Sequence, residues 1–238
     1  MKFNIPEEIL NIAEKLEKNN FQTYLVGGCV RDLLMGREPK DWDITTDAKP
    51  QEIQKIFPES VYENKFGTVA IKTGSENEKL KIVEITTFRI EGKYTDKRHP
   101  DEVKFAKTIE EDLARRDFTI NAIALALTNN KQLISKLVDP FNGQADIKNK
   151  IIRTVGNPID RFNEDALRLM RAIRFSVQLN FEIEEKTFKA VKKEAGLIEM
   201  IAKERIRDEF IKIIMASLAK KGIELLEESD LLKYIVPE

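Results

Sequence analysis

Two aspartates separated by a single residue, Asp41 and Asp43, form the first pattern whose residue types and spacing indicate chemistry. They belong to a run of β-type residues (41–46). Strand side chains alternate between faces, so we expect both carboxylates on one face and Trp42 in the core. Two converging carboxylates repel each other unless a cation lies between them, and oxygen ligands select Mg²⁺ or Mn²⁺. The pair therefore predicts a metal site, although a solvated acidic face explains the pattern equally well when it is taken alone.

A diglycine turn precedes the aspartates. A strand over residues 24–26 is followed by Gly27 and Gly28, where a helix is expected to begin. Glycines allow backbone amides to approach a phosphate closely, and the helix N-terminus adds its positive end. Arg31, one turn into that helix, offers a fork of donors to phosphate oxygens. An ordinary strand-to-helix turn would contain the same residues, so the turn is informative only together with the aspartates.

The combination of this turn with the aspartate pair is much rarer than either feature alone. It favours a triphosphate held against a pair of metal ions about 4 Å apart, arranged for in-line attack by a hydroxyl group. One metal would lower the pKa of the attacking 3′-hydroxyl, and the other would stabilise the triphosphate and the leaving pyrophosphate. The N-terminal part of the chain therefore predicts phosphoryl transfer to a hydroxyl.

The elements that must position these residues change in character near residue 150. Before this point, β-type runs alternate with helical stretches, at residues 24–26, 41–46, 67–72 and 80–86. A helix over residues 6–18 precedes them, and after residue 150 the apolar spacing is that of helices. We therefore expect an α/β domain over residues 1–150, followed by an all-α domain over residues 151–238.

Other features of the first domain allow more than one interpretation. Thr108 and Glu111 form a capping box that predicts a short helix leading to Arg115. Glu84 is a candidate third metal carboxylate, a candidate pivot for the loop that follows, or a plain edge-strand residue. Residues 90–101 are polar and predict a long loop of functional or disordered character.

Composition limits what these motifs mean. The formal net charge is −1, so no overall positive field indicates a nucleic-acid partner, and any polyanion must meet locally clustered arginines. A single cysteine, Cys29, excludes an internal disulfide and a cysteine-based zinc cluster. We find no signal-peptide pattern and no apolar run of membrane-spanning length, so we expect a cytoplasmic location and no membrane partner. Residues 225–238 stop on an apolar run, as though the chain were cut short.

Five segments of the chain, taken in order, resemble the motifs of the class II tRNA nucleotidyltransferases and bacterial poly(A) polymerases, within the polymerase-beta superfamily. The first segment is GGCVRDLLMGREPKDWDITT, which contains the diglycine turn and both aspartates. The other four lie at residues 115–122, 139–153, 164–174 and 204–209. The resemblance extends from about residue 24 to at least residue 209, which is nearly the whole chain.

This resemblance implies an α/β (α+β) polymerase-beta-like head followed by an all-α neck. It implies a template-independent nucleotidyltransferase that adds CCA to the 3′ end of tRNA from CTP and ATP and releases pyrophosphate. Asp117 is implied to recognise the ribose, with Arg116 and Asn121 supporting the nucleotide. The third segment is implied to be a hinge between head and neck, and the fifth a helix that supports the neck. The family's C-terminal body and tail, which grip the tRNA elbow, are not found, so a separate tRNA-gripping partner is one expectation.

The fourth segment also has a physical interpretation. On a helix, Asp165 and Arg168 are neighbours, as are Arg168 and Arg171. Cytosine and adenine present an amino donor beside a ring acceptor, whereas guanine and uracil present a carbonyl beside an N–H. Asp165 as acceptor and Arg168 as donor would therefore accept C or A and reject G and U. Arg171 is expected to grip phosphate, and Arg174 suits a structural ion pair as well as a ligand contact. A solvated charged face is the alternative for the whole set.

Three activities use nearly the same head and neck: CCA addition, A-only addition and poly(A) synthesis. The full-length loop at residues 90–101 argues against addition of CC alone, and the short chain argues against processive poly(A) synthesis. We therefore favour CCA addition, followed by A addition that depends on a separate CC-adding enzyme. A catalytically incomplete RNA-binding fragment is the alternative from another class, but such a module has no need for both Asp41 and Asp43.

Overall fold

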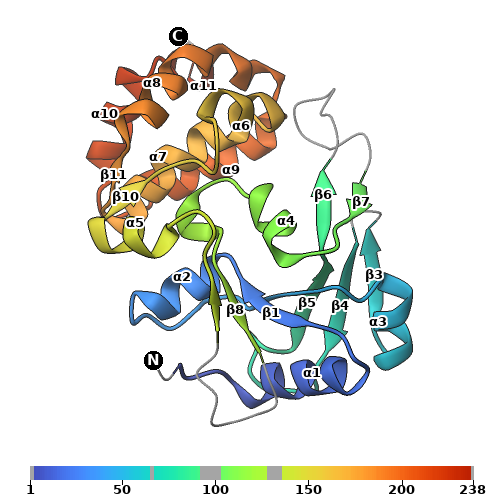
Figure 1. Ribbon diagram of the computed structural model, residues 1–238. Coiled ribbons are helices and arrows are strands. Elements are labelled where there is room, and N and C mark those ends of the chain that lie inside the picture. The colour runs from blue at the N-terminus through green and yellow to red at the C-terminus, as the bar shows by residue number, and fades with distance from the viewer. Residues whose placement is uncertain (1–2, 65–66, 92–102, 128–135, 237–238) are drawn as a thin grey trace. The chain divides into compact units, whose positions relative to one another are not determined.

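A computed structural model describes residues 3–64, 67–91, 103–127 and 136–236 of the chain, and these residues form two compact units (Figure 1). The sheet unit comprises the described residues of Met1–Ile90, Val103–Arg116 and Ile120–Gln144. The helical unit comprises those of Glu91–Glu102, Asp117–Thr119 and Ala145–Glu238. Two adjacent residues of the second family motif, Arg116 and Asp117, therefore belong to different units.

A mixed sheet forms the centre of the sheet unit. Its strand order is β3-β4-β5-β2-β1-β8-β9, and β2 runs parallel to β5. The strands are β1 (Thr23–Val26), β2 (Asp43–Thr46), β3 (Val61–Asn64), β4 (Thr68–Lys72), β5 (Ile82–Thr87), β8 (Ala124–Ala126) and β9 (Leu137–Val138). A separate two-stranded sheet joins β6 (Arg89–Glu91) and β7 (Val103–Phe105). The strands expected from the β-type runs are all confirmed, with ends that differ by one or two residues.

Short helices complete the sheet unit: α1 (Glu7–Lys18), α2 (Gly28–Leu34), α3 (Pro50–Ile56) and α4 (Ile109–Ala114). The expected N-terminal helix is thus confirmed as α1, which buries Ile9, Ile12 and Leu16 at helical spacing and packs against β1 and α3. The predicted capping box is also confirmed, because Thr108 accepts a hydrogen bond from the amide of Glu111 at the start of α4.

The register between β2 and β5 separates an apolar from a polar side of the sheet. Asp43 pairs with Glu84, and the next residues, Ile44 and Ile85, pair with each other. Ile44 and Ile85 are buried, whereas Asp43 and Glu84 are exposed. Because neighbouring residues of a strand point to opposite faces, Asp43 and Glu84 lie side by side on the open face.

The helical unit contains the second half of the described chain. Its elements are β10 (Ile151–Ile152), α6 (Pro158–Glu164), α7 (Leu167–Leu179), β11 (Glu182–Ile183), α8 (Glu185–Glu194), η2 (Ala195–Met200), α9 (Lys203–Ile214), α10 (Ala219–Glu228) and α11 (Leu232–Ile235). The helix α7 is buried along most of its length and packs against α9 and α10. The expected helical character is confirmed, apart from the parallel pair β10–β11, whose strands of two residues are too short to produce a periodic pattern.

Two short elements lie where the chain passes between the units: η1 (Thr119–Asn121) and α5 (Gly143–Asn149). None of the helices within the described ranges is long and apolar enough to cross a membrane.

Candidate active site

The two aspartates of the predicted metal site lie at the start of β2. Asp41 and Asp43 are exposed, and Trp42 between them is buried, as the alternation of a strand predicts. One detail of the prediction is wrong: the regular strand begins at Asp43, and Asp41 lies in a bend before it. The pair of exposed carboxylates is therefore held by the transition from a bend to a strand, with Trp42 as its anchor in the core.

The pKa of the Asp43 carboxyl is raised, as expected for a carboxylate that a bound cation would stabilise. Its carboxyl keeps an exposed surface, yet protein atoms crowd around it, and this desolvation is the main reason that its pKa is raised. Arg116 lowers the pKa, and the nearby charge of Asp41 raises it. A cation bound between the aspartates would remove the repulsion that raises this pKa.

The diglycine turn lies against the same carboxylate. Chain reversal after β1 places Gly27 at φ +76°, a left-handed conformation that favours glycine, and α2 begins at Gly28. A Cβ atom on Gly27 would lie 3.0 Å from Arg116 Nη1 and 3.6 Å from Asp43 Oδ2. The missing side chain thus allows the backbone, a carboxylate and a guanidinium to meet at one point.

Arg31 connects the first family motif to the second. Its Nη1 donates to Asn121 Oδ1 at 2.8 Å, while Nε and Nη2 donate to Asp32 Oδ1 at 2.9 and 2.8 Å. Arg31 and Asn121 are both buried. Both were predicted from the sequence as phosphate- or nucleotide-binding residues. The structure brings them together, and their contact with a ligand stays a prediction.

The sequence interpretation missed Asp112, a fully buried carboxylate of α4. Its Oδ1 accepts from Arg115 Nε at 3.0 Å, and its Oδ2 accepts from Arg116 Nη2 at 3.3 Å. Burial raises the pKa of this carboxyl, but the two arginines outweigh that effect and lower it. The spacing of three and four residues to consecutive arginines could have identified Asp112, because side chains at these spacings are neighbours on a helix.

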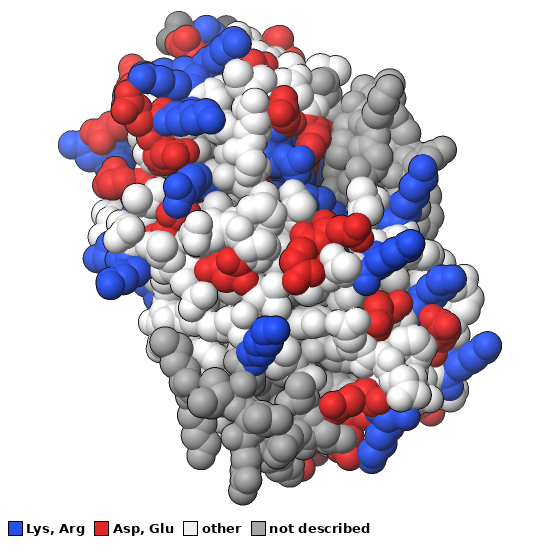
Figure 2. Space-filling model, viewed as in Figure 1, with Lys and Arg blue, Asp and Glu red and all other residues white. Residues whose placement is uncertain are grey.

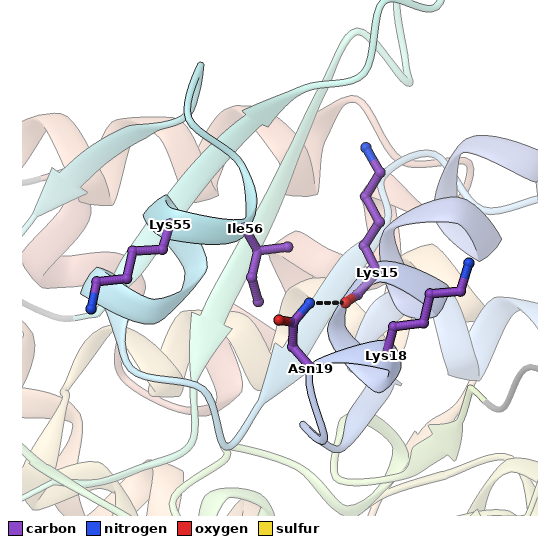
Figure 3. A pocket seen from close by; sticks show the side chains of 5 residues that line it. All are labelled: Lys15, Lys18, Asn19, Lys55 and Ile56. Atoms are coloured by element: carbon purple, nitrogen blue, oxygen red, sulfur yellow. Dashed lines mark hydrogen bonds between the residues drawn. The ribbon is translucent and has the colours of Figure 1, made fainter.

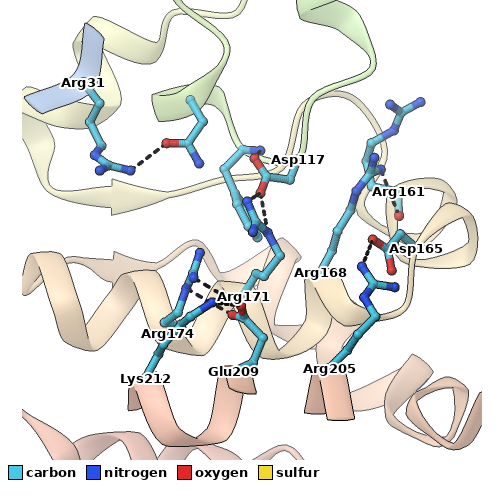
Figure 4. Close-up of polar contacts among 12 residues, drawn as sticks. Arg31, Asp117, Arg161, Asp165, Arg168, Arg171, Arg174, Arg205, Glu209 and Lys212 are labelled. Atoms are coloured by element: carbon cyan, nitrogen blue, oxygen red, sulfur yellow. Dashed lines mark hydrogen bonds and ion pairs between the residues drawn. The ribbon is translucent and has the colours of Figure 1, made fainter. Parts of the chain in front are cut away.

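In the helical unit, the predicted ribose-binding residue Asp117 is bound to Arg171. Asp117 Oδ2 accepts from Nε and Nη2 of Arg171 at 2.8 and 2.6 Å (Figure 4). Its Oδ1 accepts from the amide of Phe118 at 2.7 Å. The sequence predicted a phosphate contact for Arg171. The structure instead shows a fork of two hydrogen bonds from Arg171 to Asp117, and the phosphate contact stays a prediction.

The prediction that Asp165 and Arg168 share one helix is wrong. Asp165 follows the last residue of α6, and its Oδ1 accepts from the amide of Leu167, the first residue of α7. Aspartate is favoured at such a helix start because its side chain pairs with an amide that has no partner within the helix. The two residues therefore lie on either side of a helix boundary.

The polar partners of Asp165 and Arg168 were also not predicted. Asp165 Oδ2 accepts from Arg205 Nη2 of α9 at 3.2 Å (Figure 4). Arg168 is buried and donates through Nη1 to Glu164 Oε2 at 2.6 Å. The i,i+4 spacing of Glu164 and Arg168 could have identified the second pair, but no local pattern predicts the contact between Asp165 and Arg205.

Arg174, for which two roles had been open, forms a buried ion pair. Its Nε lies 3.1 Å from Oε2 of Glu209 on α9, and its Nη1 donates to Oε1 at 3.2 Å (Figure 4). Both side chains are buried, and the guanidinium also stacks on the ring of Phe175. Arg174 thus has the structural ion pair that was one of its two expected roles, joining α7 to α9, and a contact with nucleotide stays a prediction.

The third family motif supplies supporting contacts rather than candidate ligands. Asp139 accepts hydrogen bonds from the amides of Gly143 and Gln144 at 2.7 and 3.0 Å, which caps the start of α5. Asp146 is buried and pairs with Arg153. Both contacts hold single segments in place, and a hinge at this motif stays a prediction.

A complete metal-ligand set is not formed by the protein alone in the described ranges. No three histidine, cysteine, aspartate or glutamate side chains among these residues converge to hold an ion. Glu84 is the register neighbour of Asp43, but it does not complete such a set. Most of the predicted loop at residues 90–101 lies outside the described residues; Ile90 and Glu91 belong to β6.

Other surfaces offer weaker candidates. An open pocket lined by Lys15, Lys18, Asn19, Lys55 and Ile56 lies between α1 and α3 (Figure 3). None of the predicted site residues lines it, and Lys18 is already paired with Glu14 at 2.7 Å. Figure 2 shows acidic and basic side chains interspersed over one face, in agreement with the small net charge. The aspartate pair with its glycine turn is therefore the candidate active site.

The fold and this site define a polymerase-beta-like nucleotidyltransferase head followed by a helical region. Residues 23–153 match the family described as the poly A polymerase head domain. Residues 180–238 match a second family, described as a probable RNA and SrmB-binding site of polymerase A. The first match covers more than half of this chain, so the chain belongs to the poly A polymerase head domain family. The enzymes of this family are metal-dependent nucleotidyltransferases.

Individual relatives agree with this assignment. The chain is 45% identical over 235 residues to the CCA-adding enzyme of Lactococcus lactis subsp. cremoris (strain MG1363), across 97% of this chain and 56% of the relative. The Bacillus stearothermophilus CCA-adding enzyme in complex with CTP is 39% identical, with a TM-score of 0.82 over 94% of this chain and 52% of that one. The Thermotoga maritima CCA-adding enzyme complexed with tRNA(CCA) is 30% identical, with a TM-score of 0.79 over 97% and 52%. The chain thus spans a little over half the length of the curated relatives it matches.

Proposed function

We propose that this chain is the catalytic head and neck of an enzyme that adds CCA to the 3′ end of tRNA from CTP and ATP and releases pyrophosphate. Residues 1–150 would form the head and residues 151–238 the neck. The observation that carries the proposal is the meeting of the Gly27 backbone, the Asp43 carboxylate and the Arg116 guanidinium at one point. The likeness to CCA-adding enzymes in complex with CTP and with tRNA supports the choice of substrates.

The donor set fits Mg²⁺, with Mn²⁺ as the alternative. Magnesium binds through one or two carboxylates, keeps several waters and takes substrate phosphates as further ligands, so it does not need a third protein carboxylate. Asp41 and Asp43 are exposed oxygen donors, and the raised pKa of Asp43 reflects a carboxylate that a cation would stabilise. A bound metal would supply positive charge that polarises phosphoryl oxygens and lowers the pKa of the attacking hydroxyl.

The reaction that this site supports is substitution at the α-phosphorus of a nucleoside triphosphate. The 3′-hydroxyl oxygen of the tRNA forms a bond to that phosphorus, the bond to the β-phosphate oxygen breaks, and pyrophosphate leaves. The hydroxyl proton passes to solvent. Gly27 and Gly28 would let the backbone approach the triphosphate, and Arg116 would donate to its oxygens.

Selection of the base would belong to the helical unit. Asp165 would accept a hydrogen bond from the amino group of C or A, and Arg168 would donate to the adjacent ring acceptor. A carboxylate oxygen carries two lone pairs, so Asp165 can accept from a base while it also accepts from Leu167 and Arg205. Asp117 would accept from the ribose hydroxyl, and its pairing with Arg171 would hold it in place.

Further partners follow from the same substrates. We propose the tRNA 3′ end as the acceptor; a separate CC-adding enzyme would be a partner only if the chain adds A alone. We propose the cytoplasm as the location, in keeping with membership of a tRNA-processing enzyme family.

The test is incorporation of labelled CTP and ATP, with Mg²⁺, onto one tRNA that ends at the discriminator base and another that ends in CC. We expect the first to become CCA and extension to stop there. Addition of a single A to the CC-ended tRNA alone would indicate an A-adding enzyme, and a long A tail would indicate poly(A) synthesis. Absence of incorporation by this chain, with Asp41→Ala as the matched inactive control, would contradict the proposal.

A further inference from the structure

Within the described part of the chain, the guanidinium of Arg116 is hydrogen-bonded at one end only. Its Nη2 donates to Asp112 Oδ2 at 3.3 Å, whereas Nη1 lies against the glycine turn, 3.0 Å from the position of a Cβ on Gly27. Its Nε is buried and has no hydrogen-bond partner in the described part of the chain. A buried N–H without a partner is costly, so a fork in this position is suited to receive anionic oxygens.

Asp112 is the anchor of this fork. It is fully buried, and its Oδ1 is occupied by Arg115 and by the amide of Arg89, the first residue of β6, at 3.3 Å. Two residues, Arg115 and Arg89, therefore already hold the carboxylate before Arg116 contacts Oδ2. Because burial in protein restricts rotamers, the direction of the Arg116 side chain follows from the position of Asp112.

We propose that Asp112 is a positioning residue for nucleotide transfer: it holds Arg116 by Nη2 so that the remaining donors point at the triphosphate beside Gly27 and Asp43. This inference rests on the proposed function, because it assumes that Arg116 meets a nucleoside triphosphate. Asp112 itself does not touch the substrate. Without it, Arg116 keeps its charge but loses the fixed direction of its fork.

The test combines Asp112→Asn, Arg116→Gln and the double variant, each measured by calorimetric titration with ATP and Mg²⁺ and by KM and kcat for CTP and ATP. Asp112→Asn is expected to raise the Kd and KM about tenfold or more, with a smaller effect on kcat, since misplacement of a binding group weakens its contacts. The double variant is expected to bind no more weakly than Arg116→Gln alone, because Asp112 acts through Arg116. Losses that multiply in the double variant would overturn the proposal.

Loss of stability is separated from loss of positioning by two further variants. Ile53→Ala removes a buried side chain of α3, away from the site residues, and is expected to lower the melting temperature while the Kd for ATP stays unchanged. Arg116→Lys keeps the charge but cannot contact Asp112 and the turn at once, so it should bind ATP as weakly as Arg116→Gln. This variant keeps the test decisive if Asp112→Asn does not fold, and wild-type affinity in it would overturn the inference.

Failure of the proposed function gives a different result. If the wild-type chain neither binds ATP nor incorporates nucleotide, the proposed function and this inference fall together. If the wild type binds and incorporates, and Asp112→Asn keeps the wild-type Kd and KM, the function stands and only the positioning role is refuted.

Discussion

Replacing the charge of Asp43 is expected to remove activity and, without metal, to stabilise the fold. The pKa of this carboxyl is raised above its ordinary value of 3.8, chiefly by desolvation and further by the charge of Asp41. A carboxyl with a raised folded-state pKa binds more protons when folded than when unfolded. The free energy of unfolding therefore falls as the pH rises from 3.8 through the raised pKa. Asp43→Asn removes this loss.

The magnitude is small because the carboxyl keeps contact with solvent. Neighbouring like charges on a sheet destabilise by roughly 0.2–1 kcal/mol, and solvent screening places an exposed group near the middle of that range, at about 0.5 kcal/mol. For a chain of this size such a change raises the melting temperature by about 1–2 °C. Well below pH 3.8, where the carboxyl is protonated in both the folded and the unfolded state, the difference should disappear.

The assay is thermal unfolding of the wild type and Asp43→Asn, with EDTA and again with Mg²⁺, beside the incorporation assay. With EDTA the variant should be the more stable of the two at neutral pH, and Mg²⁺ should stabilise only the wild type. Asp208→Asn, which removes an exposed carboxylate outside the site, serves as the matched control and should respond to neither condition. A variant that is less stable than the wild type in EDTA, or a difference that persists at low pH, would refute the electrostatic argument.

Three further results are expected. Glu209→Gln should lower the free energy of unfolding by about 3–5 kcal/mol, because it leaves Arg174 charged and buried; a loss below about 1 kcal/mol in urea unfolding would contradict this. Gly222→Ala should destabilise by about 1–3 kcal/mol, although alanine is the better helix former, because its Cβ would lie 2.5 Å from Ile213 Cγ2; calorimetry that shows a higher melting temperature would refute it. The thiol of Cys29, whose pKa is raised by burial to about 12, should resist a disulfide reagent in the native protein and react on denaturation; rapid labelling of the folded chain would show that it is accessible.

Several elements of the site could be predicted from local patterns because the forces involved are local. The burial of Trp42 between two exposed aspartates follows from strand alternation, and the turn at Gly27 follows from the freedom of glycine at positive φ. The capping box at Thr108 was predicted for the same reason, since its hydrogen bond spans three residues. By contrast, the boundary at Asp165 was misplaced, because a helical apolar pattern continues through a break between two helices.

The amino-acid sequence by itself identified the candidate residues for the chemistry: an aspartate pair, a diglycine turn and arginine-rich segments whose order resembles one enzyme family. Only the tertiary structure decided how the arginines are used. Arg174 belongs to a buried ion pair with Glu209, and Asp165 is held by Arg205. The partners in these pairs are separated by 35 and 40 residues in the chain. Local spacing reveals a charged side chain, but the low dielectric of a packed interior decides its partner, because a charge can be buried only where the fold brings an opposite charge beside it.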